Sequence, residues 1–190
     1  MNVFLIRHGE TDINRAKQIQ GRGIDAPLNE LGRKQAMEVA RALQHHEFDA
    51  VVSSSLIRAR QTAEPLIRDQ RPLLSYPELD EMSFGDLEGR DFNEIKEQIN
   101  LIHKQWSTGN VEHRITGGES PAEVFNRASG KILSLLDELK PTTIAFVLHG
   151  RLLRILLSEW LGHGLKNMHL IKHSNGAINH LRWIDGSFEA

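Results

Sequence analysis

Two His-Gly pairs in this sequence each come directly after a short run of apolar residues. His8 follows Arg7 at the end of the run Val3–Ile6. His149 follows the run Ile144–Leu148. Runs of this length that are rich in Val, Ile and Phe are typical of buried strands, so both imidazoles are expected at strand ends. An imidazole can attack an electrophile or carry a proton and an arginine can grip an anion, so the two pairs indicate chemistry on an anion.

A third basic segment stands at the predicted start of a helix. The sequence SSSLIRARQTAE follows the apolar run Ala50–Val52, and its serines are expected to cap a helix that has Arg58 in its first turn. A helix N-terminus attracts phosphate through its free amide groups, and an arginine there adds a bidentate donor. By themselves, Arg58 and Arg60 are more typical of a solvated helix face.

The segment ELDEMSFGDLEG concentrates carboxylates that could donate or accept a proton. A run of this kind is often an acidic surface loop. Its glycines and Phe84 indicate instead a folded-back loop that presents one carboxylate, Glu81, to the site.

Helical periodicity lies between the predicted strands. An apolar stripe spans residues 31–43, a capping box at Ser120 opens a helix, and the apolar segment 151–162 predicts a helix packed deep against the sheet. A further strand, Ala177–Ile184, is expected at the sheet edge. Alternating strands and helices predict an α/β three-layer sandwich, in which helices cover both faces of a mostly parallel central sheet. Ligands of such folds bind outside the carboxyl ends of the strands.

Length and composition restrict the classes of protein that the chain can represent. The 190 residues fit one domain, residues 1–190, and the net charge of −2 points to neither a nucleic acid nor a membrane partner. The absence of cysteine excludes disulfides and thiol catalysis. Because no apolar stretch is long enough to span a bilayer, the expected location is cytoplasmic.

Six segments resemble, in order, the motifs of one enzyme family. They are LIRHGET with Asn14, QGRGIDAPLNELG, SSSLIRARQTA, LDEMSFGDLEG, GGES and LHG, and they cover nearly the whole chain. On these motifs the sequence resembles the histidine phosphatase superfamily, in the phosphoglycerate mutase-like branch that includes small broad-specificity and ribazole-phosphate-type phosphatases. Three residues differ from those common in relatives: Ser55, Leu87 and Arg151. None removes a catalytic group, but Arg151 leaves the pocket shape and additional anion contacts open.

The resemblance implies roles for nine residues. His8 would attack phosphorus to give a phosphohistidine, and Glu81 would protonate the leaving oxygen and then accept a proton from water. Three cationic or imidazole groups, Arg7, Arg58 and His149, would bind the phosphoryl oxygens, so no metal or other cofactor is expected. Positions that contact substrate in relatives correspond to Thr11, Asn14, Gln20 and Gly21.

Two reactions within this family remain after the resemblance is drawn. Phosphoglycerate mutases carry a longer segment before GGES with a paired arginine, whereas residues 90–116 are short here and hold only Arg114 beyond their first residue. A compact cap suits hydrolysis, because a mutase must exclude water. The sequence therefore predicts a phosphatase of small phosphomonoesters, with a cofactor-dependent phosphoglycerate mutase as the alternative. The physiological substrate, among sugar phosphates, ribazole phosphate, phosphoglycerates and phosphoproteins, and a homodimeric state stay open.

Two other classes of protein fit less well. A non-catalytic phospho-ligand binding protein would use the same arginines but should have lost His8 or Glu81, and both are present. A metal-dependent hydrolase could use His169 and His173, which stand four residues apart, but the sequence has no H-E-x-x-H or comparable cluster.

Overall fold

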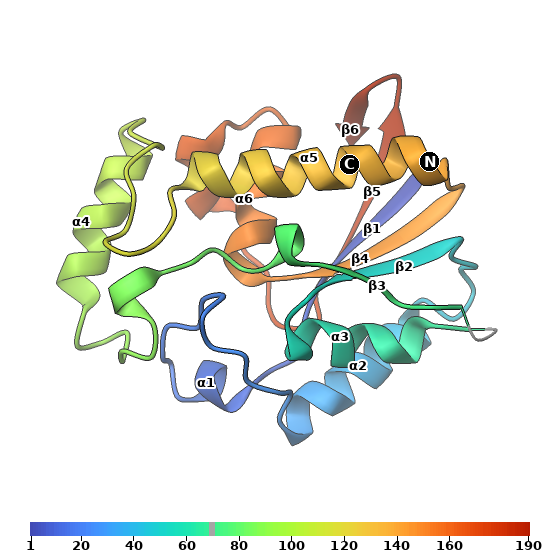
Figure 1. The fold of residues 1–190 in the computed structure, drawn as a ribbon, viewed down its shortest axis with the longest axis horizontal. Helices are drawn as coiled ribbons and strands as arrows, with labels where there is room; N and C mark the ends of the chain where they lie inside the picture. Colours follow the sequence, from blue (N-terminus) through green and yellow to red (C-terminus); the bar gives the residue numbers. More distant parts are fainter. Residues whose placement is uncertain (69–70) are drawn as a thin grey trace.

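The computed structural model describes residues 1–68 and 71–190, and its strands form a single six-stranded sheet. The strand order is β3-β2-β4-β1-β5-β6 (Figure 1). The first four strands are parallel to one another, β5 runs antiparallel to β1, and β6 runs antiparallel to β5. The sheet is therefore mostly parallel, as the sequence predicts. The strands are β1 (Asn2–Arg7), β2 (Ala50–Ser54), β3 (Leu74–Tyr76), β4 (Thr143–Leu148), β5 (Ile178–Ile184) and β6 (Ser187–Glu189).

The expected edge position of the strand near residues 177–184 is wrong. This strand, β5, pairs with β1 on one side and with β6 on the other. The two edge strands, β3 and β6, have three residues each. Segments this short carry no readable alternation of polar and apolar residues, so the sequence did not identify either.

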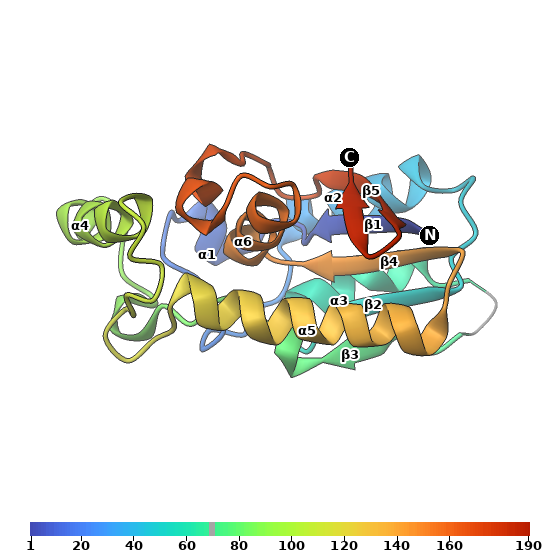
Figure 2. The same ribbon diagram turned by 90° about the horizontal axis from the view of Figure 1, so that it is seen from above.

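Helices cover both faces of the sheet, which confirms the three-layer arrangement (Figures 1 and 2). Successive residues of β1 point to opposite faces: Val3 packs with the core under α5 and α6, and Phe4 with the core under α2 and α3. The helices are α1 (Asp12–Arg15), α2 (Glu30–Ala42), α3 (Ile57–Ala63), α4 (Lys96–Ser107), α5 (Pro121–Leu139) and α6 (Gly150–Trp160), with 3₁₀ turns η1 (Glu64–Leu66), η2 (Pro77–Leu79), η3 (Gly85–Leu87) and η4 (Leu165–Leu170).

The caps of two helices show where local sequence is and is not sufficient. At α5, the Ser120 hydroxyl accepts from the Glu123 amide at 3.3 Å and the Glu123 carboxylate accepts from the Ser120 amide at 2.9 Å, which confirms the predicted capping box. At α3, no serine caps the helix. The amide of Ile57 donates instead to the Asp25 carboxylate at 2.7 Å, a contact across 32 residues that no local motif announces.

The carboxyl ends of β1, β2 and β4 lie at one edge of the sheet because these strands run parallel. Helix α4 lies beyond that edge in both views (Figures 1 and 2).

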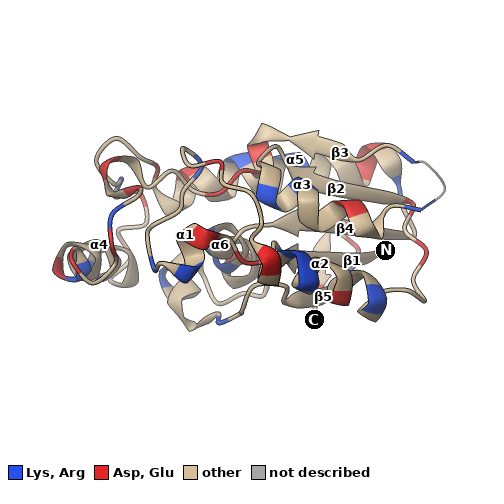
Figure 3. Cartoon of the chain, turned by 90° about the horizontal axis from the view of Figure 1, so that it is seen from below, with Lys and Arg blue, Asp and Glu red and all other residues tan. Residues whose placement is uncertain are grey.

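Acidic and basic residues are interspersed over the elements rather than segregated (Figure 3). No helix in the described part of the chain is long and apolar enough to cross a membrane.

Candidate active site

His8 stands at the end of β1 and is 3 % exposed. Its Nδ1 lies 2.7 Å from the carbonyl oxygen of Gly9. A carbonyl can only accept, so Nδ1 carries the ring proton and Nε2 keeps its lone pair. Burial first, and then the charges of Arg58 and Arg7, lower the pKa of His8 well below its ordinary value. The imidazole is therefore neutral at neutral pH and can act as a nucleophile through Nε2.

The turn after His8 requires a glycine. The Gly9 amide donates to the Thr62 hydroxyl at 3.0 Å. A Cβ at Gly9 would lie 2.4 Å from the backbone oxygen of Gly32 in α2. This clash excludes every residue except glycine at this position. This packing fixes the direction in which the chain leaves β1 and therefore the position of His8.

Two guanidinium groups flank His8, that of Arg58 fully buried and that of Arg7 half-buried. Arg7 donates through Nη1 to the His173 carbonyl at 2.9 Å. Arg58 donates to the carbonyls of Ile24 at 2.8 Å and Gly21 at 3.2 Å. Within residues 1–68 and 71–190, the buried Nε of each arginine has no hydrogen-bond partner. Burial lowers the pKa of both groups, but arginine stays cationic at neutral pH, so the two groups are suited to hold an anion beside His8.

His149 lies at the N-terminus of α6, and its ring centroid is 5.1 Å from that of His8. Its Nε2 is 2.6 Å from the Ser54 hydroxyl, whereas its buried Nδ1 has no partner in the described part of the chain. Burial first, followed by the charge of Arg58, lowers the pKa of His149 well below its ordinary value. Sequence reasoning assigned the serines to a helix cap and so missed the contact between Ser54 and His149.

Glu81 is 5 % exposed and accepts three backbone hydrogen bonds. Oε1 accepts from Met82 and Leu152, each at 2.9 Å, and Oε2 accepts from Arg151 at 3.0 Å. The carboxylate thus satisfies two amides in the first turn of α6, directly after His149. A carboxylate offers about four lone-pair sites, so three bonds leave one site, on Oε2, that can hold a proton.

Arg127 of α5 binds the backbone of the loop that carries Glu81. It donates to the carbonyls of Glu78 at 2.7 Å, Asp80 at 2.9 Å and Glu81 at 3.2 Å. It also binds both oxygens of the Glu119 carboxylate, at 2.8 and 2.9 Å. Glu119 belongs to the GGES motif, so the sequence marked this residue. The motif did not identify Arg127 as its partner.

Two of the other carboxylates in this loop, Asp80 and Glu88, have different surroundings. Asp80 accepts from the Ser55 hydroxyl at 2.8 Å, and burial raises the pKa of its carboxyl group. Glu88 accepts from the Phe84 amide at 2.9 Å. A Cβ at Gly21 would displace the Glu88 carboxylate and lie 2.9 Å from the backbone oxygen of Met82, so Gly21 leaves little space for a side chain.

Three of the predicted substrate-binding residues form one polar cluster. The Thr11 hydroxyl and the Asn14 amide both donate to Gln20 Oε1, at 2.7 and 3.1 Å. Asn175, which the sequence did not single out, donates to the His8 carbonyl at 3.0 Å and to Asn14 Oδ1 at 3.2 Å. Asn175 therefore connects this cluster to the backbone of His8.

The alternative metal centre has no support in the geometry. Among residues 1–68 and 71–190, no group of three or more His, Asp or Glu side chains could hold a metal ion. His169 belongs to η4 and His173 lies beyond its end, so the two do not share a helix. The residues that do meet at this edge of the sheet include arginines, whose guanidinium groups are suited to an anion.

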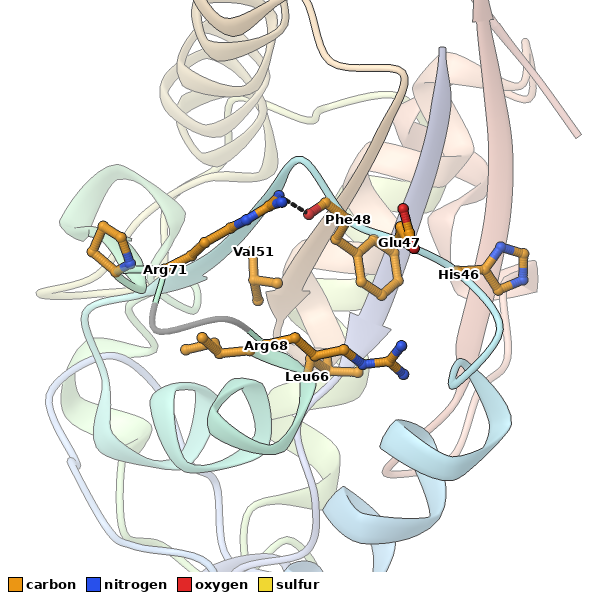
Figure 4. A pocket seen from close by; sticks show the side chains of 9 residues that line it. His46, Glu47, Phe48, Val51, Leu66, Arg68 and Arg71 are labelled. Carbon is orange, nitrogen blue, oxygen red and sulfur yellow. Dashed lines mark hydrogen bonds between the residues drawn. The ribbon is translucent and has the colours of Figure 1, made fainter.

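A further pocket lies at the amino end of β2, away from these residues (Figure 4). Its volume is about 130 Å³. The Arg71 guanidinium in its wall already donates to the Phe48 carbonyl at 2.7 Å. Since Phe48 and Leu66 also pack in the core between the sheet, α2 and α3, this pocket is a gap at the rim of that core.

Comparison with known proteins agrees with this geometry. Residues 3–190 match the model of the histidine phosphatase superfamily (branch 1). The chain is 36 % identical over 163 residues to "Probable phosphoglycerate mutase GpmB" of Proteus mirabilis, covering 85 % of this chain and 75 % of that protein. The family match spans nearly the whole sequence, so the chain belongs to the histidine phosphatase superfamily.

Solved structures with the same fold include two phosphatases. The alpha-ribazole phosphatase from Shigella flexneri has a TM-score of 0.84 and 29 % identity, and covers 99 % of this chain and 93 % of its own. A phosphoserine phosphatase from Entamoeba histolytica, solved with 3-phosphoglyceric acid, has a TM-score of 0.84 and 28 % identity, with the same coverage. Both likenesses extend over the whole sheet and its covering helices.

Proposed function

We propose that this protein is a phosphatase that hydrolyses small-molecule phosphomonoesters through a phosphohistidine on His8. The observation that carries the proposal is the neutral His8 ring, with its proton on Nδ1 and its Nε2 lone pair beside the guanidinium groups of Arg7 and Arg58. Arg7, Arg58 and His149 bind the phosphoryl oxygens and offset the negative charge that develops on them in the transition state. The two arginines supply the positive charge and His149 adds a hydrogen bond, so the proposed reaction needs no metal.

The reaction has two displacement steps at phosphorus. In the first, His8 Nε2 attacks phosphorus, the bond to the ester oxygen breaks, and Glu81 gives its proton to the leaving alcohol. In the second, Glu81 takes a proton from water, the water oxygen attacks phosphorus, and the P–N bond breaks to release inorganic phosphate. The free lone-pair site on Glu81 Oε2 carries the proton before the first step and takes one up again in the second, so Glu81 is an ionised carboxylate between the two steps.

The proposed substrate-binding residues lie on one side of His8. Thr11, Asn14 and Gln20 form a cluster that is tied to the backbone of His8 through Asn175, and Gly21 supplies backbone next to Arg58. We propose that the side-chain amides of the cluster contact the phosphoryl group or the adjoining part of the substrate. The two phosphatases of the same fold carry names that refer to phosphomonoesters, which supports this substrate class.

Phosphoglycerate mutase is the second candidate, because the curated relative at 36 % identity carries that name. A mutase must grip the carboxylate of phosphoglycerate and hold the intermediate away from water. The arginine suited by sequence to this task, Arg114, already forms an ion pair with Glu123 at 2.9 Å. This pairing favours hydrolysis over transfer.

The distinguishing experiment follows the products of 3-phosphoglycerate. The protein is incubated with 3-phosphoglycerate and a bisphosphoglycerate primer, and inorganic phosphate and 2-phosphoglycerate are measured over time. We expect any substrate consumed to appear as inorganic phosphate and glycerate. Formation of 2-phosphoglycerate that depends on the primer and is lost in His8→Ala would replace the phosphatase assignment with the mutase.

A further inference from the structure

A basic pocket of about 370 Å³ lies between α4, α6 and η4. None of the described residues that line it is acidic. Its wall combines cationic and imidazole groups with one indole, and these residues are Arg151, Lys104, Lys166, His103, His169 and Trp106. A concave surface with several cationic groups and no carboxylate is suited to an anion.

Arg151 is the central positive charge of this pocket. Its guanidinium lies 5.5 Å from the centre of the Trp106 ring, and its Nη2 is 2.9 Å from His103 Nε2. Within the described ranges it forms no ion pair with a carboxylate. Neutral groups therefore hold the guanidinium in place, and the nearby Glu81 carboxylate acts on its charge without contacting it.

His103 orients Arg151 as a neutral acceptor. Burial first, and then the charge of Arg151, lowers the pKa of His103 to about 4. At neutral pH its Nε2 can thus accept a hydrogen bond from the guanidinium. The guanidinium carries five N–H groups in a rigid fork, and this contact uses one of them. The others remain able to bind a carboxylate or phosphate through two parallel hydrogen bonds.

The pocket adjoins the reacting centre through the backbone of α6. The Arg151 amide donates to Glu81 Oε2, the proposed proton donor, at 3.0 Å. The preceding residue, Gly150, packs so closely that a Cβ there would lie 3.3 Å from the Arg7 guanidinium. The backbone of Gly150 and Arg151 therefore lies against Arg7 and Glu81, the groups proposed to contact the phosphoryl group and the leaving oxygen. The side chain of Arg151 lines the pocket.

We propose that this pocket binds a second anionic group, a carboxylate or phosphate, on the leaving-group half of the substrate. The inference rests on the proposed phosphatase activity, since it assigns the part of the substrate beyond the ester oxygen. Arg151 is the principal contact, and Lys104 and Lys166 add positive charge at the rim. The preferred substrates are phosphomonoesters of hydroxy acids or of compounds that carry another phosphate.

The test compares two matched series of substrates. ω-Carboxyalkyl phosphates with one to five methylene groups are assayed beside ω-hydroxyalkyl phosphates of the same lengths. We expect kcat/KM to favour the carboxyl series at the length that spans from Glu81 to Arg151. Hydrogen bonds between charged groups are worth roughly 1.5–3 kcal/mol, so Arg151→Ala should reduce this preference about 10- to 100-fold. Rates for the hydroxyl series should change far less.

Two further variants separate binding from folding. Lys104 and Lys166 have exposed side chains, so the double variant Lys104→Ala/Lys166→Ala should keep its fold and still lose part of the preference. Lys96→Ala removes an exposed charge from the same helix α4, outside the pocket, and should leave the preference unchanged. A preference that falls equally in all three variants would indicate a general charge effect and overturn the proposal.

Three other outcomes also contradict the proposal. If Arg151→Ala lowers kcat/KM equally for both series, Arg151 only joins α6 to α4 through His103. If free butyrate accelerates hydrolysis of the hydroxyalkyl phosphates, the pocket binds an anion that is not part of the substrate. If the protein hydrolyses both series at equal rates in a His8-dependent reaction, the phosphatase assignment stands and the pocket assignment fails. The absence of hydrolysis in either series would remove the proposed function itself.

Discussion

Replacing Glu81 with glutamine separates its proposed chemical role from its structural one. The three backbone hydrogen bonds on the carboxylate define what the change removes. The glutamine carbonyl can accept the bonds from Met82 and Leu152, but its NH₂ group then faces the Arg151 amide, donor against donor. Losing one hydrogen bond to a charged acceptor should lower the free energy of unfolding by about 1.5–3 kcal/mol. The protein should therefore fold, at reduced stability.

The chemical effect of Glu81→Gln should depend on the leaving group. An alkoxide is a poor leaving group and needs a proton, so kcat/KM for an alkyl phosphate should fall about 10²- to 10⁴-fold. Nitrophenolate leaves readily without a proton, so nitrophenyl phosphate should lose much less. Because Glu81 is also proposed to activate water in the second step, the comparison uses kcat/KM or the burst of alcohol release in rapid-quench experiments, which report the first step.

Glu88→Gln is the matched control for this comparison. Glu88 lies in the same loop and its carboxylate also accepts a backbone amide, from Phe84 at 2.9 Å. It should leave the ratio of alkyl to nitrophenyl rates unchanged. Equal losses for both esters in Glu81→Gln would refute the acid role and leave Glu81 as a cap of α6. Leaving-group dependence in Glu88→Gln instead would transfer the acid role to Glu88.

Three further predictions concern the contacts of Arg127, acid pH and metals. Arg127→Met leaves Glu119 without its buried partner, so the free energy of unfolding in urea should fall by about 3 kcal/mol. The loop that carries Glu81 should also shift and lower kcat/KM. Wild-type stability and kcat/KM would contradict the role of Arg127 in holding this loop. Burial and neighbouring arginines lower the pKa of both His103 and His173 to about 4, below an unfolded value of about 6.5. Their contribution, about 1–2 kcal/mol each after solvent screening, is complete above pH 6.5 and is lost as the pH falls toward 4. A pH series of unfolding curves checks this, and replacing both with glutamine should flatten it. Excess chelator should leave hydrolysis intact; a loss that magnesium or zinc restores would indicate a metalloenzyme.

The local sequence was sufficient where structure depends on residues close together in the chain. The apolar runs that became β1 and β4, and the capping box that opens α5, carry their own physical cause in their residues. The parallel order of these strands then brings Arg7 and His149 to one edge, which periodicity and strand ends alone predict. The resemblance to a known family added Glu81 from among several loop carboxylates.

Contacts between distant segments could not be read from the sequence. Ser54 reaches His149 across 95 residues, and Asn175 reaches the His8 carbonyl across 167. Arg127 holds the loop of Glu81 from a helix 46 residues away. Each pairing depends on how the helices pack on the sheet, and serine, asparagine and arginine have no local pattern that fixes a distant partner. These supporting residues therefore emerge only from the three-dimensional arrangement.

The covalent intermediate on His8 is the most direct test of the whole account. Protein mixed with a ³²P-labelled phosphomonoester is quenched in alkali within milliseconds, and the labelled peptide is identified by mass spectrometry. The account predicts label on His8 that survives alkali, is lost in acid, and is absent in His8→Ala. Label that is stable in acid, that lies on another residue, or that persists in His8→Ala would contradict it.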